Sequence, residues 1–250
     1  MSKAASELIL NNDGSIYHCN IRPEHVADLI LTVGDPDRVK EVSKYFDKIE
    51  FKTQKREIVT HVGTFNGKRI TVISTGMGTD NIDIVLNELD ALANIDLATG
   101  QIKSDLRQLQ IVRLGTSGSL HADIPVDSFV TSSHGLGFDG LMYFYEGTEK
   151  ILDDELSQAF IEHSNWDKRK PVPYFVEGSK SLLEILSSDQ TNSGITATAT
   201  GFYGPQGRFL RLQPNPEDIN EVLSGFKFND LRITNFEMET SAIYGLSKML

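Results

Sequence analysis

Two carboxylates, Glu237 and Glu239, stand two positions apart in the run NFEMETSA at 235–242. On an extended segment a spacing of two sends both side chains to the same side. Two acids on one side suit a ligand with neighbouring hydroxyl groups, such as a ribose. The pattern is weakly specific alone, and it gains meaning from three arginine-bearing loops upstream.

Two of these loops follow predicted strands and combine glycine with arginine. GDPDR at 34–38 follows the apolar run 29–33, and RLGTSG at 113–118 overlaps the end of the run 110–114. A glycine between a strand and a helix exposes backbone N–H groups that suit an oxyanion. An arginine near the end of an apolar strand is costly to bury without a counter-charge. Because ligands of open α/β sheets bind beyond the carboxyl ends of strands, both loops indicate a phosphate site.

Simpler interpretations stay open for these loops. An ordinary strand-to-helix turn capped by Asp35 would explain the first, and a salt bridge from Arg113 to a structural carboxylate would explain the second. By themselves, KRE at 55–57 reads as a solvated charge cluster and His18 as a surface or satisfied histidine. The phosphate hypothesis therefore depends on the two glycine–arginine loops occurring together.

The third loop, GFYGPQGR at 201–208, has a different character. Its aromatic residues offer flat apolar surface. Gln206 presents both a donor and an acceptor, whereas Arg208 presents only donors. Together they match a planar ring with alternating carbonyls and an N–H, such as uracil. A polar surface turn is the simpler alternative.

Other chemistries find little support in the sequence. There is no His-rich or Cys-rich metal spacing and no HExxH, so we expect no metal site. There is no serine-containing nucleophile elbow and no GxGxxG fingerprint. Gly76-Met77-Gly78 lacks the third glycine of a dinucleotide-binding loop.

The composition argues against several partners. A net charge of −11 over 250 residues disfavours nucleic acid and anionic membranes. No apolar run approaches the roughly 20 residues that span a bilayer, and the first residues, MSKAASELIL, lack the features of a secretion signal. The single cysteine, Cys19, fits a reducing compartment. We therefore expect a cytoplasmic protein.

Short apolar runs alternate with helical patterns, which predicts an α/β fold with a largely parallel or mixed sheet. We expect strands at 29–33, 70–74, 110–114, 128–132 and 196–200, a type I′ hairpin turn at Asn66-Gly67, and helices from Pro36, from Asp80, around 177–187 and from about 240 to 250. Residues 203–230 are rich in turn formers and are predicted to be a surface excursion. The length suits one domain spanning 1–250.

Taken together, these segments resemble the nucleoside phosphorylase family, and within it the uridine phosphorylases. The matching motifs are, in the family's order, GDPDR at 34–38, KRE at 55–57, STGMG at 74–78, RLGTSG at 113–118, FYGPQGR at 202–208 and NFEMETSA at 235–242. FYGPQGR is the element that resembles the pyrimidine branch. The likeness covers most of the chain from His18 onward.

The resemblance implies the role of each site residue. A phosphate site would comprise Gly34, Arg38, Arg56, Arg113 and Thr116. The ribose would be held by His18, Met238 and Glu239, and the base by Phe202, Gln206 and Arg208. Arg113, Arg208 and Glu239 would carry the catalysis, with inorganic phosphate as co-substrate and no cofactor or metal.

The resemblance also implies an architecture and an assembly. The fold would be a single α/β domain with a central, mixed, barrel-like sheet flanked by helices. Members form homodimers, or hexamers of such dimers, in which His18 and Arg56 complete the neighbour's site. The implied reaction is the reversible phosphorolysis of uridine to uracil and ribose 1-phosphate.

One departure from the family pattern is expected at the C-terminal end. The family chain continues past the EMES-type helix into another core strand and a terminal helix, whereas this sequence stops at Leu250. Three alternatives to a uridine phosphorylase stay open: a purine nucleoside phosphorylase, a nucleosidase on the same fold, and a non-catalytic nucleoside-binding subunit.

Overall fold

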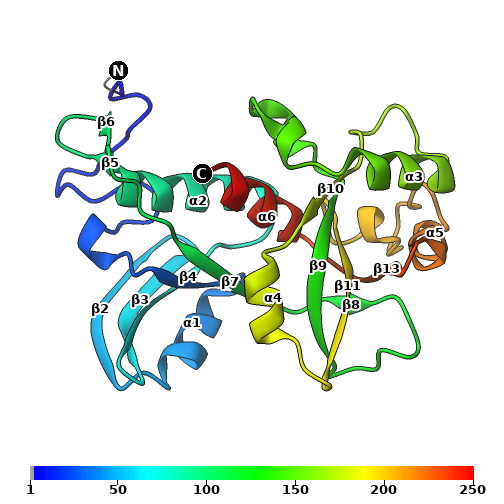
Figure 1. Ribbon diagram of the computed structural model, residues 1–250, viewed down its shortest axis with the longest axis horizontal. Coiled ribbons are helices and arrows are strands. Elements are labelled where there is room, and N and C mark those ends of the chain that lie inside the picture. Colours follow the sequence, from blue (N-terminus) through cyan, green and yellow to red (C-terminus); the bar gives the residue numbers. More distant parts are fainter. Residues whose placement is uncertain (1–2) are drawn as a thin grey trace. The chain divides into compact units, whose positions relative to one another are not determined.

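A computed structural model describes residues 3–250, and these residues group into two compact units. Unit 1 holds the chain up to Met77, residues 81–115 and Leu250, and unit 2 holds residues 78–80 and 116–249. Each unit contains a mixed β-sheet and its own helices (Figure 1). The predicted α/β class is therefore confirmed, whereas the single domain over 1–250 stays a prediction.

Unit 1 is built on a five-stranded sheet in the order β2-β3-β4-β1-β7. Its strands are β1 (Leu29–Val33), β2 (Lys48–Lys55), β3 (Ile58–Phe65), β4 (Lys68–Ser74) and β7 (Gln110–Leu114), with a separate pair β5 (Ile95–Asp96) and β6 (Gln101–Ile102). β1 runs parallel to β4 and β7, and β3 is antiparallel to β2 and β4. The carboxyl ends of three neighbouring strands consequently lie at one edge.

Local sequence explains the elements of unit 1. The backbone has positive φ at both Asn66 (49°) and Gly67 (74°), as a type I′ turn requires. The unit's helices are α1 (Pro36–Ser43), α2 (Thr79–Asn94) and the 3-10 turn η1 (Pro23–His25). Asp35 caps α1 by accepting from the Asp37 N–H at 2.9 Å, and Val39 of α1 packs on the sheet with Val59 and Val72.

Unit 2 contains a second sheet in the order β10-β9-β11-β13-β12, with β8 paired to β13. Its strands are β8 (Gly118–Ser119), β9 (Phe129–Gly137), β10 (Tyr174–Glu177), β11 (Thr191–Thr198), β12 (Lys227–Phe228) and β13 (Leu231–Glu237). β11 runs parallel to β9 and β13, whereas β8, β10 and β12 pair antiparallel. The predicted strand at 128–132 is thus the first half of a longer one.

Four helices belong to the described part of unit 2. They are α3 (Asp154–Ser164), α4 (Lys180–Leu186), α5 (Ile219–Gly225) and α6 (Thr240–Met249), with the 3-10 turns η2 (Leu141–Phe144), η3 (Thr148–Lys150) and η4 (Gly204–Gln206). Helix α6 lies along β9 and β11, and α3 and α5 neighbour each other (Figure 1). Phe160, Phe175 and Phe226 pack together in the core beneath α3 and α5.

Two expectations require correction. Across residues 3–250 the strands form separate open sheets and no closed barrel, because the five-stranded sheet of unit 1 ends at β2 and β7 and the main path of unit 2 ends at β10 and β12. Residues 203–230 are not only a surface excursion, since α5 buries Ile219 and Leu223, and Phe226 follows them into the core. The spacing of these three apolar residues suits one face of a helix.

Residues 3–250 contain no helix that combines the length and apolar character needed to traverse a bilayer.

Stability should fall in mild acid partly because of His61 on β3. The residue is 5% exposed, and burial, followed by the charges of Lys52 and Lys40, lowers its pKa from 6.5. The unfolded chain therefore takes up a proton on this residue at a higher pH than the folded chain does. This contribution to stability is present above about pH 6.5 and is lost as the pH falls below it.

We expect the urea midpoint of the unaltered protein to drop between pH 7.5 and pH 5.5, and that of His61→Asn to drop less. In the unaltered chain the Ser43 hydroxyl lies 2.7 Å from Nδ1 of His61, and the asparagine side chain keeps a polar partner for it. Equal drops in the two proteins would contradict this role of His61.

Candidate active site

The first predicted loop pair lies at the carboxyl edge of the unit 1 sheet. In the parallel pairing of β1 with β7, Val33 stands opposite Leu114. Gly34 and Arg113 therefore occupy the same edge, although they are far apart in the sequence. Arg38, on the first turns of α1, donates from Nη1 to the Leu114 carbonyl at 3.3 Å. The structure thus brings the segments of Arg38 and Arg113 together within unit 1.

The small residue after Arg113 has a direct steric role. A Cβ atom added to Gly115 would lie 1.6 Å from Nη1 of Arg113. The guanidinium group therefore lies over the Gly115 backbone, where any side chain would displace it. Gly34 also has a close neighbour, because a Cβ added there would lie 3.5 Å from the Gly76 carbonyl oxygen. The guanidinium groups of Arg38 and Arg113 are thus both placed at this edge, which suits an oxyanion.

The two remaining predicted phosphate residues are placed differently. Arg56 lies in the tight turn between β2 and β3, with a positive φ of 54° and an exposed side chain. Thr116 is the first residue of the long segment of unit 2 and is also exposed. Arg56 is thus presented on a surface, as a residue that serves another subunit would be.

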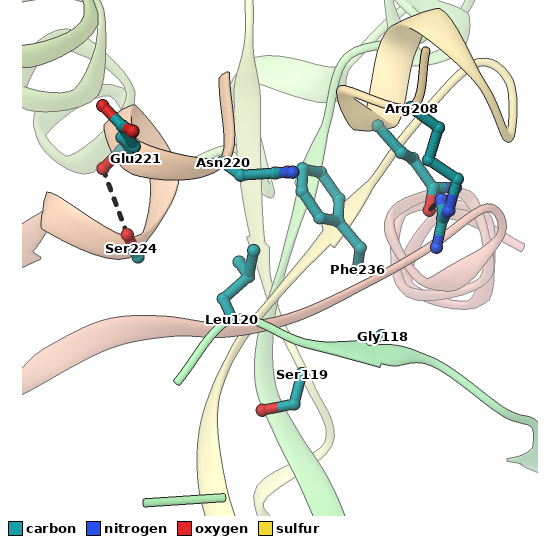
Figure 2. A pocket seen from close by; sticks show the side chains of 9 residues that line it. Gly118, Ser119, Leu120, Arg208, Asn220, Glu221, Ser224 and Phe236 are labelled. Carbon is teal, nitrogen blue, oxygen red and sulfur yellow. Dashed lines mark hydrogen bonds between the residues drawn. The ribbon is translucent and has the colours of Figure 1, made fainter. Parts of the chain in front are cut away.

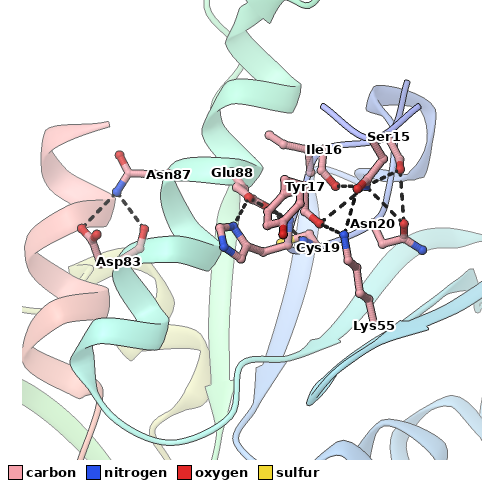
Figure 3. Close-up of polar contacts among 11 residues, drawn as sticks. Ser15, Ile16, Tyr17, Cys19, Asn20, Lys55, Asp83, Asn87 and Glu88 are labelled. Atoms are coloured by element: carbon pink, nitrogen blue, oxygen red, sulfur yellow. Dashed lines mark hydrogen bonds and ion pairs between the residues drawn. The ribbon is translucent and has the colours of Figure 1, made fainter. Parts of the chain in front are cut away.

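His18 belongs to the N-terminal segment of unit 1, in which the neighbouring Tyr17 and Cys19 lie beside Lys55 and Glu88 (Figure 3). Its Nδ1 lies 2.6 Å from Oε1 of Glu88, on α2. The Lys55 ammonium group lies 4.1 Å from the centre of the Tyr17 ring and donates to the Tyr17 carbonyl. Glu88 was not among the residues identified from the sequence, because nothing in the pattern of α2 distinguishes it from a solvated carboxylate.

Two of the predicted base-binding residues, Gln206 and Arg208, line a cavity of about 300 Å³ in unit 2 (Figure 2), whereas Phe202 lies outside its lining. Arg208 donates from Nη1 to the side-chain oxygen of Gln206 and, at 2.8 Å, to the Phe202 carbonyl. The guanidinium carbon also lies 3.9 Å from the centre of the Phe202 ring, within the range of a cation–π contact. The three residues therefore form one interlocked group.

The other residues that line the cavity were not predicted from the sequence as base-binding residues. The other lining residues are Gly118, Ser119, Leu120, Asn220, Glu221, Ser224 and Phe236. Figure 2 shows Asn220 extending from α5 toward the ring of Phe236. These residues come from β8 and the residue after it, from α5 and from β13, which are distant in sequence. The helical spacing of Ile219, Leu223 and Phe226 could have identified α5 from the sequence, but residues 203–230 were predicted to be a surface excursion.

The two carboxylates near the C-terminus, Glu237 and Glu239, have different hydrogen-bond partners. Strand β13 ends at Glu237 and α6 begins at Thr240, so the expected extended segment does not continue to Glu239. Glu237 accepts from the backbone N–H groups of Glu239 (2.9 Å) and Thr240 (2.9 Å) and from the Thr198 hydroxyl (2.8 Å). The idea that both acids face a ligand is therefore wrong for Glu237, which caps α6.

Glu239 contacts one of the motifs on which the family resemblance rests. Its side chain is buried, and Oε1 accepts from the Gly78 N–H at 2.8 Å, within the STGMG motif. Met238, between the two acids, is half-buried. Among residues 3–250 no cluster of three potential metal-ligating side chains occurs.

Unit 1 thus has a sheet edge that carries Arg38 and Arg113, and unit 2 has a cavity lined by Gln206 and Arg208. The chain belongs to the phosphorylase superfamily, whose family model matches residues 28–250.

Individual relatives are similar over most of the chain. The crystal structure of a Trypanosoma brucei nucleoside phosphorylase that shows uridine phosphorylase activity matches with a TM-score of 0.85 and 33% identity, over 97% of this chain and 86% of that one. A uridine phosphorylase of Thermococcus kodakarensis is 28% identical over 95% of this chain and 73% of its own length. A DeoD-type purine nucleoside phosphorylase of Alkaliphilus metalliredigens is 26% identical, over 92% and 80%.

The capping role of Glu237 can be tested by measuring the stability of a variant. Glu237→Gln replaces a buried carboxylate that accepts several N–H and O–H donors, so we expect a loss of about 2 kcal/mol in the free energy of unfolding, measured with urea. Asp218→Asn is a matched control, because Asp218 precedes α5 without a side-chain capping bond in the described structure. If Glu237→Gln were no less stable than Asp218→Asn, the capping function would be refuted.

Proposed function

We propose that this protein is a pentosyltransferase that catalyses the reversible phosphorolysis of uridine to uracil and ribose 1-phosphate. The observation that carries the proposal is the presence of Gln206 and Arg208 side by side in the wall of the unit 2 cavity, with Phe202 packed against Arg208. The cavity wall therefore offers an amide and a guanidinium to a flat ring. Uridine phosphorylases among the relatives support the same assignment.

Phosphate is the proposed nucleophile and needs no cofactor. The backbone at Gly34 and the guanidinium groups of Arg38 and Arg113 would bind it, with the Thr116 hydroxyl as a further donor. Arg56 would come from a neighbouring subunit, which its exposed turn supports. Holding the nucleophile near the anomeric carbon replaces a two-body encounter by a local step.

Bond cleavage places opposite charges on the two halves of the nucleoside. The ribose gains oxocarbenium character, which the Glu239 carboxylate favours while it binds the sugar hydroxyls above Met238. The departing uracil gains negative charge, which Arg208 stabilises while Gln206 orients the ring. Donors aimed at developing charge are worth roughly 3–4 kcal/mol each. The delocalised uracil anion needs no side-chain general acid.

The proposed assembly is a homodimer or a hexamer of dimers, in which His18 reaches the 5′-hydroxyl of a nucleoside bound by the neighbour. The proposed setting is pyrimidine salvage in the cytoplasm, which the buried, unpaired Cys19 supports. A purine nucleoside phosphorylase is the second candidate, because the DeoD-type enzyme of Alkaliphilus metalliredigens is similar over most of the chain.

A phosphate-dependence assay tests the proposal. We expect uracil release from uridine only when inorganic phosphate is present, and at least about tenfold slower turnover of inosine, since a pocket built to hydrogen-bond one base discriminates against another. Uracil release without phosphate would identify a nucleosidase. Faster inosine turnover would identify a purine enzyme, and binding of uridine without any product would identify a non-catalytic subunit.

The Gly115→Ala variant tests the phosphate site. Because the added methyl group must displace the Arg113 guanidinium, we expect the KM for phosphate to rise about tenfold, with little loss of stability. Gly225→Ala is the control, since a Cβ there has ordinary van der Waals room, 3.7 Å from the nearest atom of His163. An unchanged KM for phosphate in Gly115→Ala would count against Arg113 as a phosphate ligand.

A further inference from the structure

Glu88 holds the His18 segment at several points (Figure 3). The backbone N–H of His18 donates to both carboxylate oxygens, at 3.0 and 3.1 Å, and the N–H of Cys19 donates to Oε2 at 2.7 Å. The imidazole Nδ1 lies 2.6 Å from Oε1. The Glu88 side chain is only 13% exposed. In a chain of net charge −11, a largely buried acid is costly unless it is fully paired, and these donors pair it.

These contacts determine which ring nitrogen carries the proton. Both oxygens of Glu88 already accept backbone N–H groups, Oε1 from His18 and Oε2 from Cys19. Nδ1 of His18 must therefore be the donor in the ring contact, and Nε2 is the nitrogen left for a ligand. The Tyr17 ring packs edge-on against the imidazole, with centroids 4.8 Å apart and planes at 85°, which further restrains the ring.

We propose that Glu88 is a positioning residue that places the His18 proton on Nδ1 and orients Nε2 toward the 5′-hydroxyl of the nucleoside ribose. The inference rests on the proposed function, which supplies the nucleoside. A ring held through its backbone and its side chain loses little freedom on binding, so the hydroxyl contact contributes more to transition-state binding. Glu88 itself touches no substrate atom.

Substrate comparison separates this role from a structural one. In Glu88→Gln we expect kcat/KM for uridine to fall about tenfold, whereas kcat/KM for 5′-deoxyuridine, which lacks the hydroxyl, stays within about twofold. His18→Ala should give the same pattern, and the double variant should lose no more than either single variant. Asp90→Asn removes an equal charge from α2, where its partner is Asn94 at 2.6 Å, and should leave both substrates unaffected. Equal losses on uridine and 5′-deoxyuridine in Glu88→Gln would overturn the proposal.

The imidazole can also be observed without turnover. In ¹⁵N-histidine-labelled protein, with the His18 resonances assigned by their absence from His18→Ala, we expect a protonated Nδ1 in the unaltered chain and a changed signal in Glu88→Gln. A His18 ring that carries its proton only on Nε2 would overturn the assignment to Glu88, whatever the activity. Failure of the unaltered protein to convert uridine with phosphate would instead refute the proposed function, so the two failures are distinguishable.

Discussion

Parallel pairing of β1 with both β4 and β7 is the constraint on which the candidate phosphate site depends. Strands that run the same way end at the same edge, so the loops after them emerge side by side. GDPDR, STGMG and RLGTSG each begin at the end of one of these strands or overlap it. The Arg38 contact with the Leu114 carbonyl follows directly from this pairing. Without it, arginines distant in sequence would not share an edge.

The carboxylates of this acidic chain have partners that assign them different roles. Glu237 is committed to the start of α6, and Glu88 is committed to the backbone and ring at residues 18–19. Glu239 accepts an N–H from the STGMG motif and is the acid that the proposed chemistry uses. The cost of desolvation explains why each of these acids has hydrogen-bond partners, because a buried carboxylate is stable only when donors lie close to it.

Much of the fold could be predicted where local signals are strong. The strand Leu29–Val33, the turn at Asn66-Gly67 and the strand Gln110–Leu114 were predicted with the bounds that the structure has. Apolar runs and turn residues determine these elements over a few positions. Prediction failed for 203–230, where three apolar residues are separated by polar ones and only packing against the core reveals the helix.

The sequence by itself determined the α/β class, the glycine–arginine loops and the Gln206–Arg208 pair, because these depend on residue type and short spacing. Only the tertiary structure decided that Glu237 caps α6, that α5 lines the cavity beside Gln206 and Arg208, and that Glu88 contacts His18. The last contact joins residues 70 positions apart. Such contacts arise from the packing of elements that are distant in sequence, and no local sequence pattern predicts them.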